Sequence, residues 1–264
     1  MNRETLLLTA INAAIAGGKE ILEVYESDFA VEHKDDKSPL TEADKRAHLA
    51  IVAILKETQL PVLSEEGKDI PFEERKNWDA FWMVDPLDGT KEFIKRNGEF
   101  TVNIALIENQ QSTMGIIYVP VTNELYFADD KAYKVQDSKL NLESLEQLTE
   151  QAHQLPLSQN RNNYVVVGSR SHMSEETEVF INEQKAKHQE VDILSKGSSL
   201  KLCMVAEGAA DSYPRFAPTM EWDTAAGQAI AIASGAEVLN WENKNRMQYN
   251  KENLLNSWFL VTRN

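Results

Sequence analysis

The sequence predicts an α/β protein in which helical and sheet layers alternate. Two segments near the N-terminus repeat apolar residues every three or four positions, which is the period of an amphipathic helix. A β-rich stretch follows from 101 to 135, and beyond 163 short apolar strands alternate with helices. Such alternation is typical of α/β layers, because each helix buries its apolar face against a sheet.

The first elements carry one long apolar helix face, formed by Leu7, Ile11, Ala14, Gly18, Leu22 and Tyr25. Thr41 is placed to cap a second helix, which keeps the helical period at positions 47, 51, 54 and 55. A short strand at 61–63 ends at the acidic pair Glu65-Glu66, and another strand runs from Phe81 to Val84. Antiparallel strands are then expected at Thr101–Glu108, Thr113–Val119, Glu124–Ala128 and Ala132–Val135.

The polar residues 137–163, with a helix expected at 142–152, predict a hinge between two halves. We expect residues 1–140 to form an N-terminal α+β half and residues 160–264 to form a C-terminal α/β half. In the second half, strands are expected at 164–167, 191–194, 211–214, 237–239 and 258–261, and helices at 175–187, 199–206 and 223–233.

Composition restricts the class of partner. The 264 residues carry a formal charge of −15, which argues against a nucleic-acid polymer, since such binding depends on a basic face. The negative charge is compatible with a small phosphorylated ligand if metal ions and a few cationic side chains make the electrostatic potential positive in one cleft. The single cysteine, Cys203, excludes an internal disulfide and favours a reducing cytoplasm. We expect neither a membrane span nor a targeting segment.

The run Trp82-Met-Val-Asp85-Pro-Leu-Asp88-Gly89-Thr90 is the most informative stretch. An apolar strand delivers two carboxylates three positions apart, the proline restricts φ, and the glycine permits conformations that other residues resist. Both carboxylates can therefore face one hard cation such as Mg²⁺, which prefers oxygen ligands.

Alternatives to a metal site exist for this run. An EF-hand needs acids at alternate positions, and the D-x-D-G-T motif of the haloacid dehalogenase phosphatases has one residue fewer between its acids. An ordinary turn after a strand also favours Asp-Pro and Asp-Gly.

Four further acids lie where predicted elements begin or end: Glu65 and Glu66 after a strand, Asp44 three residues after Thr41, and Asp223 at the start of a helix. Each has a structural interpretation as a helix-capping or turn residue. In order and in kind, however, T-x-x-D, E-E, D-P-L-D-G-T and W-D-x-A match one family. The chain resembles the inositol monophosphatase superfamily of magnesium-dependent, lithium-sensitive phosphatases, nearly end to end.

Within that superfamily, four segments are most similar to the bacterial 3'(2'),5'-bisphosphate nucleotidases: 85–100, Ser169-Arg-Ser-His172, Gly197-Ser-Ser-Leu-Lys201 and 213–216. Inositol phosphatases typically have Thr-Asn-Phe where this chain has Lys91-Glu92-Phe93. The resemblance implies a layered α-β-α-β-α sandwich of the inositol monophosphatase and sugar phosphatase type.

The resemblance also implies roles for individual residues. Two or three Mg²⁺ per site are expected on Glu65, Asp85, Asp88, Asp223 and the Leu87 carbonyl. Asp44 and Thr90 would act on the attacking water, together with Glu65 as a catalytic residue. Substrate contacts are expected from Gly89, Thr90, Ser169, His172, Gly197, Lys201 and Asp223. For the second phosphate the candidates are Arg170, Lys196 and Arg215.

The implied reaction is hydrolysis of 3'-phosphoadenosine 5'-phosphate to AMP and phosphate, or of its sulfated precursor to adenylyl sulfate, in sulfur metabolism. Two alternatives stay open: an inositol-phosphate or fructose-1,6-bisphosphate phosphatase with the same metals, and a non-catalytic nucleotide sensor. The expected location is the cytoplasm, with peripheral association at the inner face of the plasma membrane left open, as is the oligomeric state.

Overall fold

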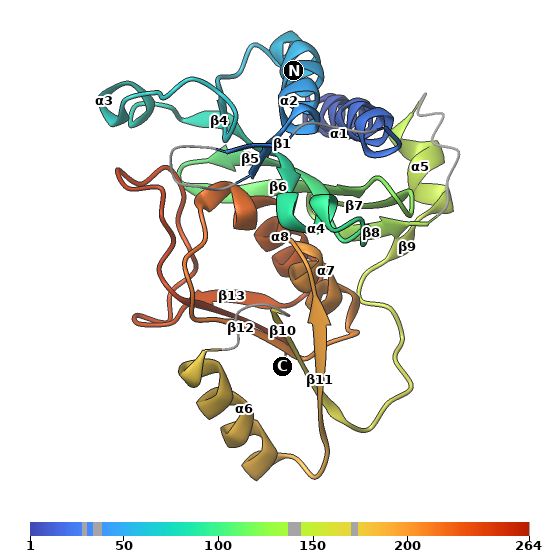
Figure 1. Ribbon diagram of the computed structural model, residues 1–264, viewed down its shortest axis with the longest axis vertical. Coiled ribbons are helices and arrows are strands. Elements are labelled where there is room, and N and C mark those ends of the chain that lie inside the picture. Colours follow the sequence, from blue (N-terminus) through green and yellow to red (C-terminus); the bar gives the residue numbers. More distant parts are fainter. Residues whose placement is uncertain (28–30, 34–38, 137–143, 170–173, 264) are drawn as a thin grey trace.

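The computed structural model describes residues 1–27, 31–33, 39–136, 144–169 and 174–263, without the side chains of 31–33, 39–41 and 169. Five layers follow one another down the molecule (Figure 1). Two N-terminal helices cover a seven-stranded sheet, two C-terminal helices fill the middle, and a five-stranded sheet with one outer helix completes the stack. The predicted α-β-α-β-α sandwich is therefore confirmed.

The first layer consists of α1 (Arg3–Tyr25) and α2 (Glu42–Leu55), which pack against each other. Asn2 caps α1 by accepting a hydrogen bond of 2.8 Å from the Thr5 amide. By length and composition alone α1 could cross a membrane, whereas the sequence predicted no membrane span. Its apolar residues, among them Ile11, Ala14 and Ile21, are instead buried in a core shared with α2 and the sheet below. The helix is thus a core element of this fold.

The seven-stranded sheet has the order β3-β4-β5-β6-β7-β8-β9 and is antiparallel apart from the β3–β4 pair. Its strands are β3 (Val62–Ser64), β4 (Ala80–Asp88), β5 (Thr101–Glu108), β6 (Gln111–Val119), β7 (Glu124–Ala128), β8 (Ala132–Val135) and β9 (His153–Gln154). The long strands β4, β5 and β6 are mostly buried, because helices cover both faces of the sheet, whereas His153 and Gln154 of β9 are exposed.

Strand β4 continues past the expected end at Val84 and includes both acids of the central motif. Asp85 pairs with Asn103 and Asp88 with Thr101 on β5, and the register shifts between them. Pro86 lies inside this bulge, where its missing N–H costs no regular ladder bond. The bulge therefore lets two carboxylates three residues apart reach the same end of the sheet.

The middle layer contains α7 (Leu200–Glu207) and α8 (Glu221–Ala233), and α8 contacts β5 and β6 of the large sheet. Below them the second sheet has the order β11-β10-β12-β14-β13, and α6 (Glu175–Lys187) covers its outer face. The strands are β10 (Tyr164–Ser169), β11 (Val191–Lys196), β12 (Ser212–Arg215), β13 (Glu237–Asn240) and β14 (Phe259–Thr262). One hydrophobic core runs through both sheets and the middle helices.

Short elements complete the chain and were not predicted: β1 (Val31–His33), β2 (Pro39–Thr41), the 3-10 turn η1 (Lys56–Thr58), α3 (Phe72–Arg75) and α4 (Thr90–Ile94). The helix expected at 142–152 is α5 (Leu145–Gln151), and residues 137–143 lie outside the described residues. The two sheets divide near the expected hinge, while α8 packs on both; the assignment of two halves stays a prediction.

Candidate active site

Three acids from different elements meet between the large sheet and α8. Glu65 follows β3, Asp85 lies in β4, and Asp223 lies in the first turn of α8. One carboxylate oxygen of each lies within 4.8 Å of the others. Asp44, in the first turn of α2, is buried and close enough for its charge to raise the pKa of Asp85. The structure thus gathers four of the acids that the sequence singled out.

Burial and mutual repulsion disfavour charge in this cluster. Burial raises the pKa of Asp85 well above its usual range, and the charges of Glu65, Asp88, Asp223 and Asp44 raise it further. The pKa of Asp223 is raised well above its usual range by burial and then by Asp88 and Glu65. A cation between the carboxylates would relieve both costs, and a set of oxygen ligands suits a hard divalent ion.

Asp88 stands at the boundary between this cluster and the C-terminal half of the chain. Its Oδ2 accepts a hydrogen bond of 2.5 Å from the Ser199 amide, at the N-terminal end of α7, and a longer one of 3.4 Å from Asn103. Burial raises the pKa of Asp88, whereas the charge of Lys201 and the two hydrogen bonds lower it. The charge of Asp88 raises the pKa of Asp223, but Asp88 is not part of the three-carboxylate group.

The chain turns directly after Asp88. Gly89 has a φ of 98°, a region that L side chains rarely adopt, and a Cβ there would lie 3.1 Å from the Glu99 carbonyl oxygen. Thr90 begins α4, and its hydroxyl donates to the Leu87 carbonyl at 3.4 Å. The Leu87 amide in turn donates to Asp85 Oδ1 at 3.0 Å, so this turn is tied to the cluster.

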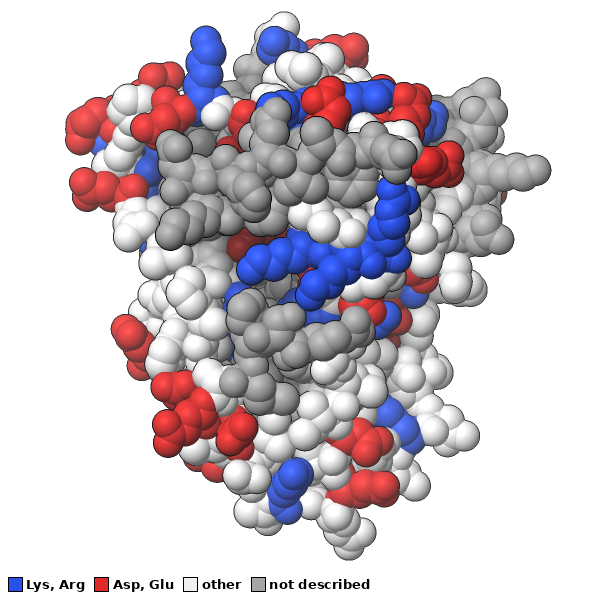
Figure 2. Space-filling model, in the orientation of Figure 1, with Lys and Arg blue, Asp and Glu red and all other residues white. Residues whose placement is uncertain are grey.

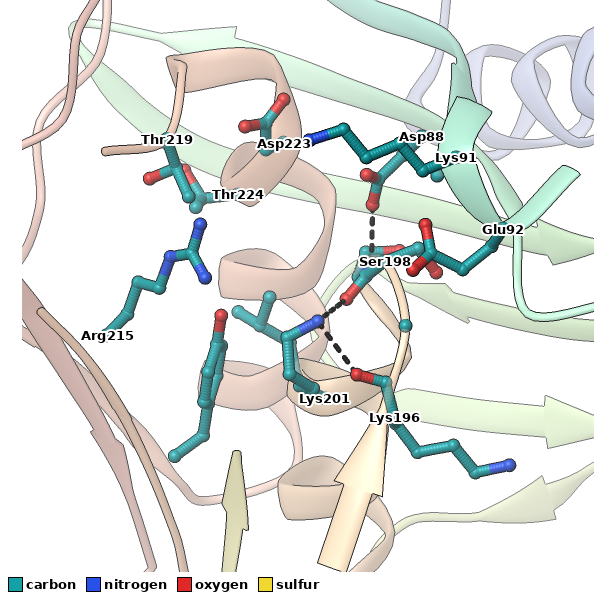
Figure 3. A pocket seen from close by; sticks show the side chains of 15 residues that line it. Asp88, Lys91, Glu92, Lys196, Ser198, Lys201, Arg215, Thr219, Asp223 and Thr224 are labelled. Atoms are coloured by element: carbon teal, nitrogen blue, oxygen red, sulfur yellow. Dashed lines mark hydrogen bonds between the residues drawn. The ribbon is translucent and has the colours of Figure 1, made fainter. Parts of the chain in front are cut away.

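A cleft of about 150 Å³ opens beside Asp88 and Asp223. It lies between α4, the β11–α7 turn, β12 and the start of α8, and most of the labelled side chains project into it (Figure 3). It is lined by Asp88, Gly89, Lys91, Glu92, Lys196, Gly197, Ser198, Ser199, Lys201, Leu202, Tyr213, Arg215, Thr219, Asp223 and Thr224.

Four cationic side chains line the cleft together with the acids Asp88, Glu92 and Asp223. Lys91, Lys196, Lys201 and Arg215 line it, and Figure 2 shows Lys and Arg side chains gathered at the middle of this face. Burial lowers the pKa of Lys201 to about 8, although Asp88 opposes that shift. The ammonium of Lys201 donates to the Ser198 carbonyl at 2.5 Å and lies 5.6 Å from the centre of the Tyr213 ring. An acidic protein therefore presents a local site for anions.

The β11–α7 turn is held against the N-terminal half of the chain. The Gly197 amide donates to Glu99 Oε2 at 2.8 Å, and Lys196 pairs with the same carboxylate at 3.5 Å. A Cβ on Gly197 would come within 2.7 Å of the Glu92 side chain and 2.8 Å of the Glu99 carbonyl oxygen. Glycine is required here because two segments approach closely.

The structure brings together most of the residues that the sequence predicted. Gly89, Gly197, Lys201 and Asp223 line one cleft, as do Lys196 and Arg215. Arg170 and His172 lie outside the described residues, and only the backbone of Ser169 is described, at the end of β10. Residues not assigned from the sequence also line the cleft: Lys91, Glu92, Ser198, Tyr213, Thr219 and Thr224. The Lys91-Glu92, Gly197–Lys201 and 213–216 segments of the family resemblance were the available signal for four of them: Lys91, Glu92, Ser198 and Tyr213.

A group of buried and half-buried carboxylates suited to a hard cation lies next to a cationic cleft in a five-layer α/β sandwich. This combination defines a class, the metal-dependent phosphatases. The sequence matches the model of the inositol monophosphatase family over residues 2–261. The chain belongs to the inositol monophosphatase family, whose phosphatases are metal-dependent.

Individual relatives narrow the comparison. The chain is 45% identical over 250 residues to the 3'(2'),5'-bisphosphate nucleotidase CysQ of Salmonella typhimurium, covering 93% of this chain and 94% of that protein. Identity to Escherichia coli K12 CysQ is 44% over 251 residues, with the same coverage of both chains. The crystal structure of CysQ from Bacteroides thetaiotaomicron superposes with a TM-score of 0.91 at 52% identity, covering 99% of this chain and 98% of that one.

Proposed function

We propose that the protein is a 3'(2'),5'-bisphosphate nucleotidase that hydrolyses 3'-phosphoadenosine 5'-phosphate to AMP and inorganic phosphate. The observation that carries the proposal is the position of the carboxylate cluster at one end of a cleft with four cationic side chains. A substrate with two phosphate groups needs one of them at the metal site and a second anion site at a distance. The relatives named CysQ support the same substrate class.

The proposed cofactor is Mg²⁺, with two or three ions per site. Its ligands would be Glu65, Asp85, Asp88 and Asp223, with the carbonyl oxygen of Leu87. The raised pKa values of Asp85 and Asp223 support this assignment, because clustered negative charge is what a divalent cation compensates. Bound magnesium would polarise the phosphate and acidify the attacking water.

Asp44 and Thr90 are proposed to act on that water. Asp44 is buried in the first turn of α2. It would accept the proton of the water, while the Thr90 hydroxyl orients it. Thr90 already donates to the Leu87 carbonyl, so its hydroxyl position is constrained. Glu65, which lies in the cluster with Asp85, is proposed to act as a catalytic residue as well.

The substrate would extend from the cluster along the cleft. Backbone amides of Gly89 and Thr90 are proposed to hold the scissile phosphate beside Asp223. Lys201 and Gly197 are proposed nucleotide contacts, as are Ser169 and His172 on the sequence argument alone. Lys196 and Arg215 would hold the second phosphate, with Arg170 as a further candidate, and both described residues line the cleft.

A substrate panel tests the proposal. Phosphate release is measured from 3'-phosphoadenosine 5'-phosphate, inositol 1-phosphate and fructose 1,6-bisphosphate with Mg²⁺, and again with added Li⁺. We expect the adenosine bisphosphate to react fastest, with inhibition by lithium. Faster release from inositol 1-phosphate or fructose 1,6-bisphosphate would refute the nucleotidase assignment. If the protein released phosphate from none of the three compounds, the alternative of a non-catalytic nucleotide sensor would be favoured.

The proposal extends to the cellular setting. The relatives and the acidic composition support a cytoplasmic enzyme that acts on a small nucleotide rather than on a nucleic-acid polymer. Action on 3'-phosphoadenylyl sulfate, which carries the same 3'-phosphate, belongs to the same proposal and is tested by adding that compound to the panel.

A further inference from the structure

A buried polar network connects Asp88 to both β5 and α7. Thr101 and Asn103 lie on β5, opposite Asp88 and Asp85 respectively. Ser199 immediately precedes α7. The side chains of Thr101, Asn103 and Ser199 are 2% exposed or less, although all three are polar. Burying a polar group lowers the stability of the fold unless the group has hydrogen-bond partners.

The hydrogen bonds of this network fix the orientation of the Asn103 side chain. Ser199 Oγ donates to Asn103 Oδ1 at 2.8 Å, and Thr101 Oγ1 lies 3.0 Å from the same oxygen and 2.8 Å from Ser199 Oγ. The amide oxygen of Asn103 is thereby committed to the two hydroxyls. Its nitrogen, which can only donate, must then point the other way, toward Asp88 Oδ2 at 3.4 Å.

Asp88 receives both of these donors on one oxygen. The Ser199 amide and Asn103 Nδ2 reach Oδ2, and among the described residues no hydrogen bond reaches Oδ1. One carboxylate oxygen is therefore anchored, and the rotation of the group is fixed with it. Oδ1 is left as the oxygen that can meet a cation.

We propose that Thr101, Asn103 and Ser199 form a positioning network that orients Asp88 as a metal ligand. The inference rests on the proposed function, because it takes Asp88 to bind the catalytic cation. Partners of this kind hold ligating groups in place, and their loss typically weakens metal affinity by about 10–100-fold. The network also joins the metal ligand to the turn that carries Gly197, Ser198 and Lys201. The cation site and the cationic cleft are thus held in one geometry.

The decisive variant is Asn103→Leu, which keeps a similar volume but removes the donor to Asp88 and the acceptor for both hydroxyls. Binding of Mn²⁺ to the substrate-free protein is followed by the loss of the free-ion signal in electron paramagnetic resonance. We expect the dissociation constant to rise by about 10–100-fold. A value within threefold of the wild type would overturn the proposal, provided that the wild type binds Mn²⁺ and Asp85→Asn weakens that binding.

A double variant tests the network where Asn103→Leu fails to fold. Thr101→Val and Ser199→Ala each leave one hydroxyl to hold the Asn103 oxygen, whereas the pair leaves none. We expect each single change to weaken Mn²⁺ binding by less than about threefold and the pair to weaken it by tenfold or more, since coupled residues are not additive. Additive effects in the double variant would contradict the network.

The control separates positioning from stability. Thr58→Val removes another buried threonine hydroxyl, which bonds Leu55 and Trp82 on the α2 side of the sheet. It should lower the metal-free melting temperature without changing Mn²⁺ affinity. If the wild type binds no Mn²⁺, or Asp85→Asn binds it equally well, the proposed function fails together with this inference. Weakened binding in the network variants but not in Thr58→Val supports the proposal.

Discussion

Replacing Asp85 with asparagine should stabilise the metal-free protein while removing its activity. Asparagine keeps the shape of the side chain and still accepts the 3.0 Å hydrogen bond from the Leu87 amide. It removes one negative charge from a group whose oxygens lie within 4.8 Å of one another. At that separation and an effective dielectric of about 20, two full charges repel by about 3.5 kcal/mol.

The net gain is smaller than this Coulomb value. The raised pKa values of Asp85 and Asp223 mean that protons already relieve part of the repulsion. We therefore expect the free energy of unfolding to rise by about 1–3 kcal/mol, which is about 2–10 °C in melting temperature for a chain of this size. Saturating Mg²⁺ should reverse the order, because a ligand at about 1,000 times its Kd stabilises the wild type by about 4.1 kcal/mol.

Differential scanning calorimetry of both proteins, in EDTA and in Mg²⁺, measures this crossover. Thr58→Val serves again as a control, since it should lower the melting temperature equally in both buffers. The reasoning would be refuted if Asp85→Asn melted below the wild type in EDTA, or if Mg²⁺ stabilised both proteins to the same extent.

Three further predictions follow from the site. In EDTA, the melting temperature should fall as the pH rises from 4.5 to 7.5, because the raised pKa values of Asp85 and Asp223 keep protons on the folded protein that the unfolded chain has already lost. Mg²⁺ should flatten this profile, and a melting temperature that rises with pH in EDTA would contradict the prediction. Lys201→Met should raise KM for the adenosine bisphosphate about 10–100-fold and change kcat less, because the variant loses a charge-assisted hydrogen bond to the substrate. Steady-state kinetics measure both constants, and an unchanged KM would show that Lys201 does not contact the substrate. Gly89→Ala should lower the free energy of unfolding by about 1–2 kcal/mol, because residue 89 has a φ of 98°, and it should lower kcat at least tenfold. Denaturant unfolding and steady-state kinetics test this prediction, and wild-type values in both measurements would contradict it.

Much of the acidic site could be predicted from the sequence because its residues lie in short motifs at the ends of strands and helices. Glu65, Asp85 and Asp223 each follow or begin a recognisable apolar segment, and the family resemblance supplied their common purpose. The layered fold followed from the same alternation of strands and helices, and the structure confirms it.

The contacts that hold the site together could not be predicted in the same way. Asp88 and Ser199 are 111 residues apart, and only the tertiary fold, which places the residue before α7 beside β4 and β5, brings them into contact. The extension of β4 through Asp88 depends on pairing with β5, which no local pattern around Pro86 indicates. Helices α3 and α4 have four and five residues, too short for a periodic signal. Tertiary contacts decide each of these features.

The identity of the product tests the central claim most directly. The wild-type protein is incubated with 3'-phosphoadenosine 5'-phosphate and Mg²⁺, and the products are followed by ³¹P nuclear magnetic resonance. Parallel samples contain EDTA or the Asp88→Asn variant. The account predicts that 5'-AMP and inorganic phosphate form only in the complete wild-type reaction. Formation of adenosine 3'-phosphate, or equal turnover by Asp88→Asn or in EDTA, would contradict a metal-dependent 3'-nucleotidase built on these carboxylates.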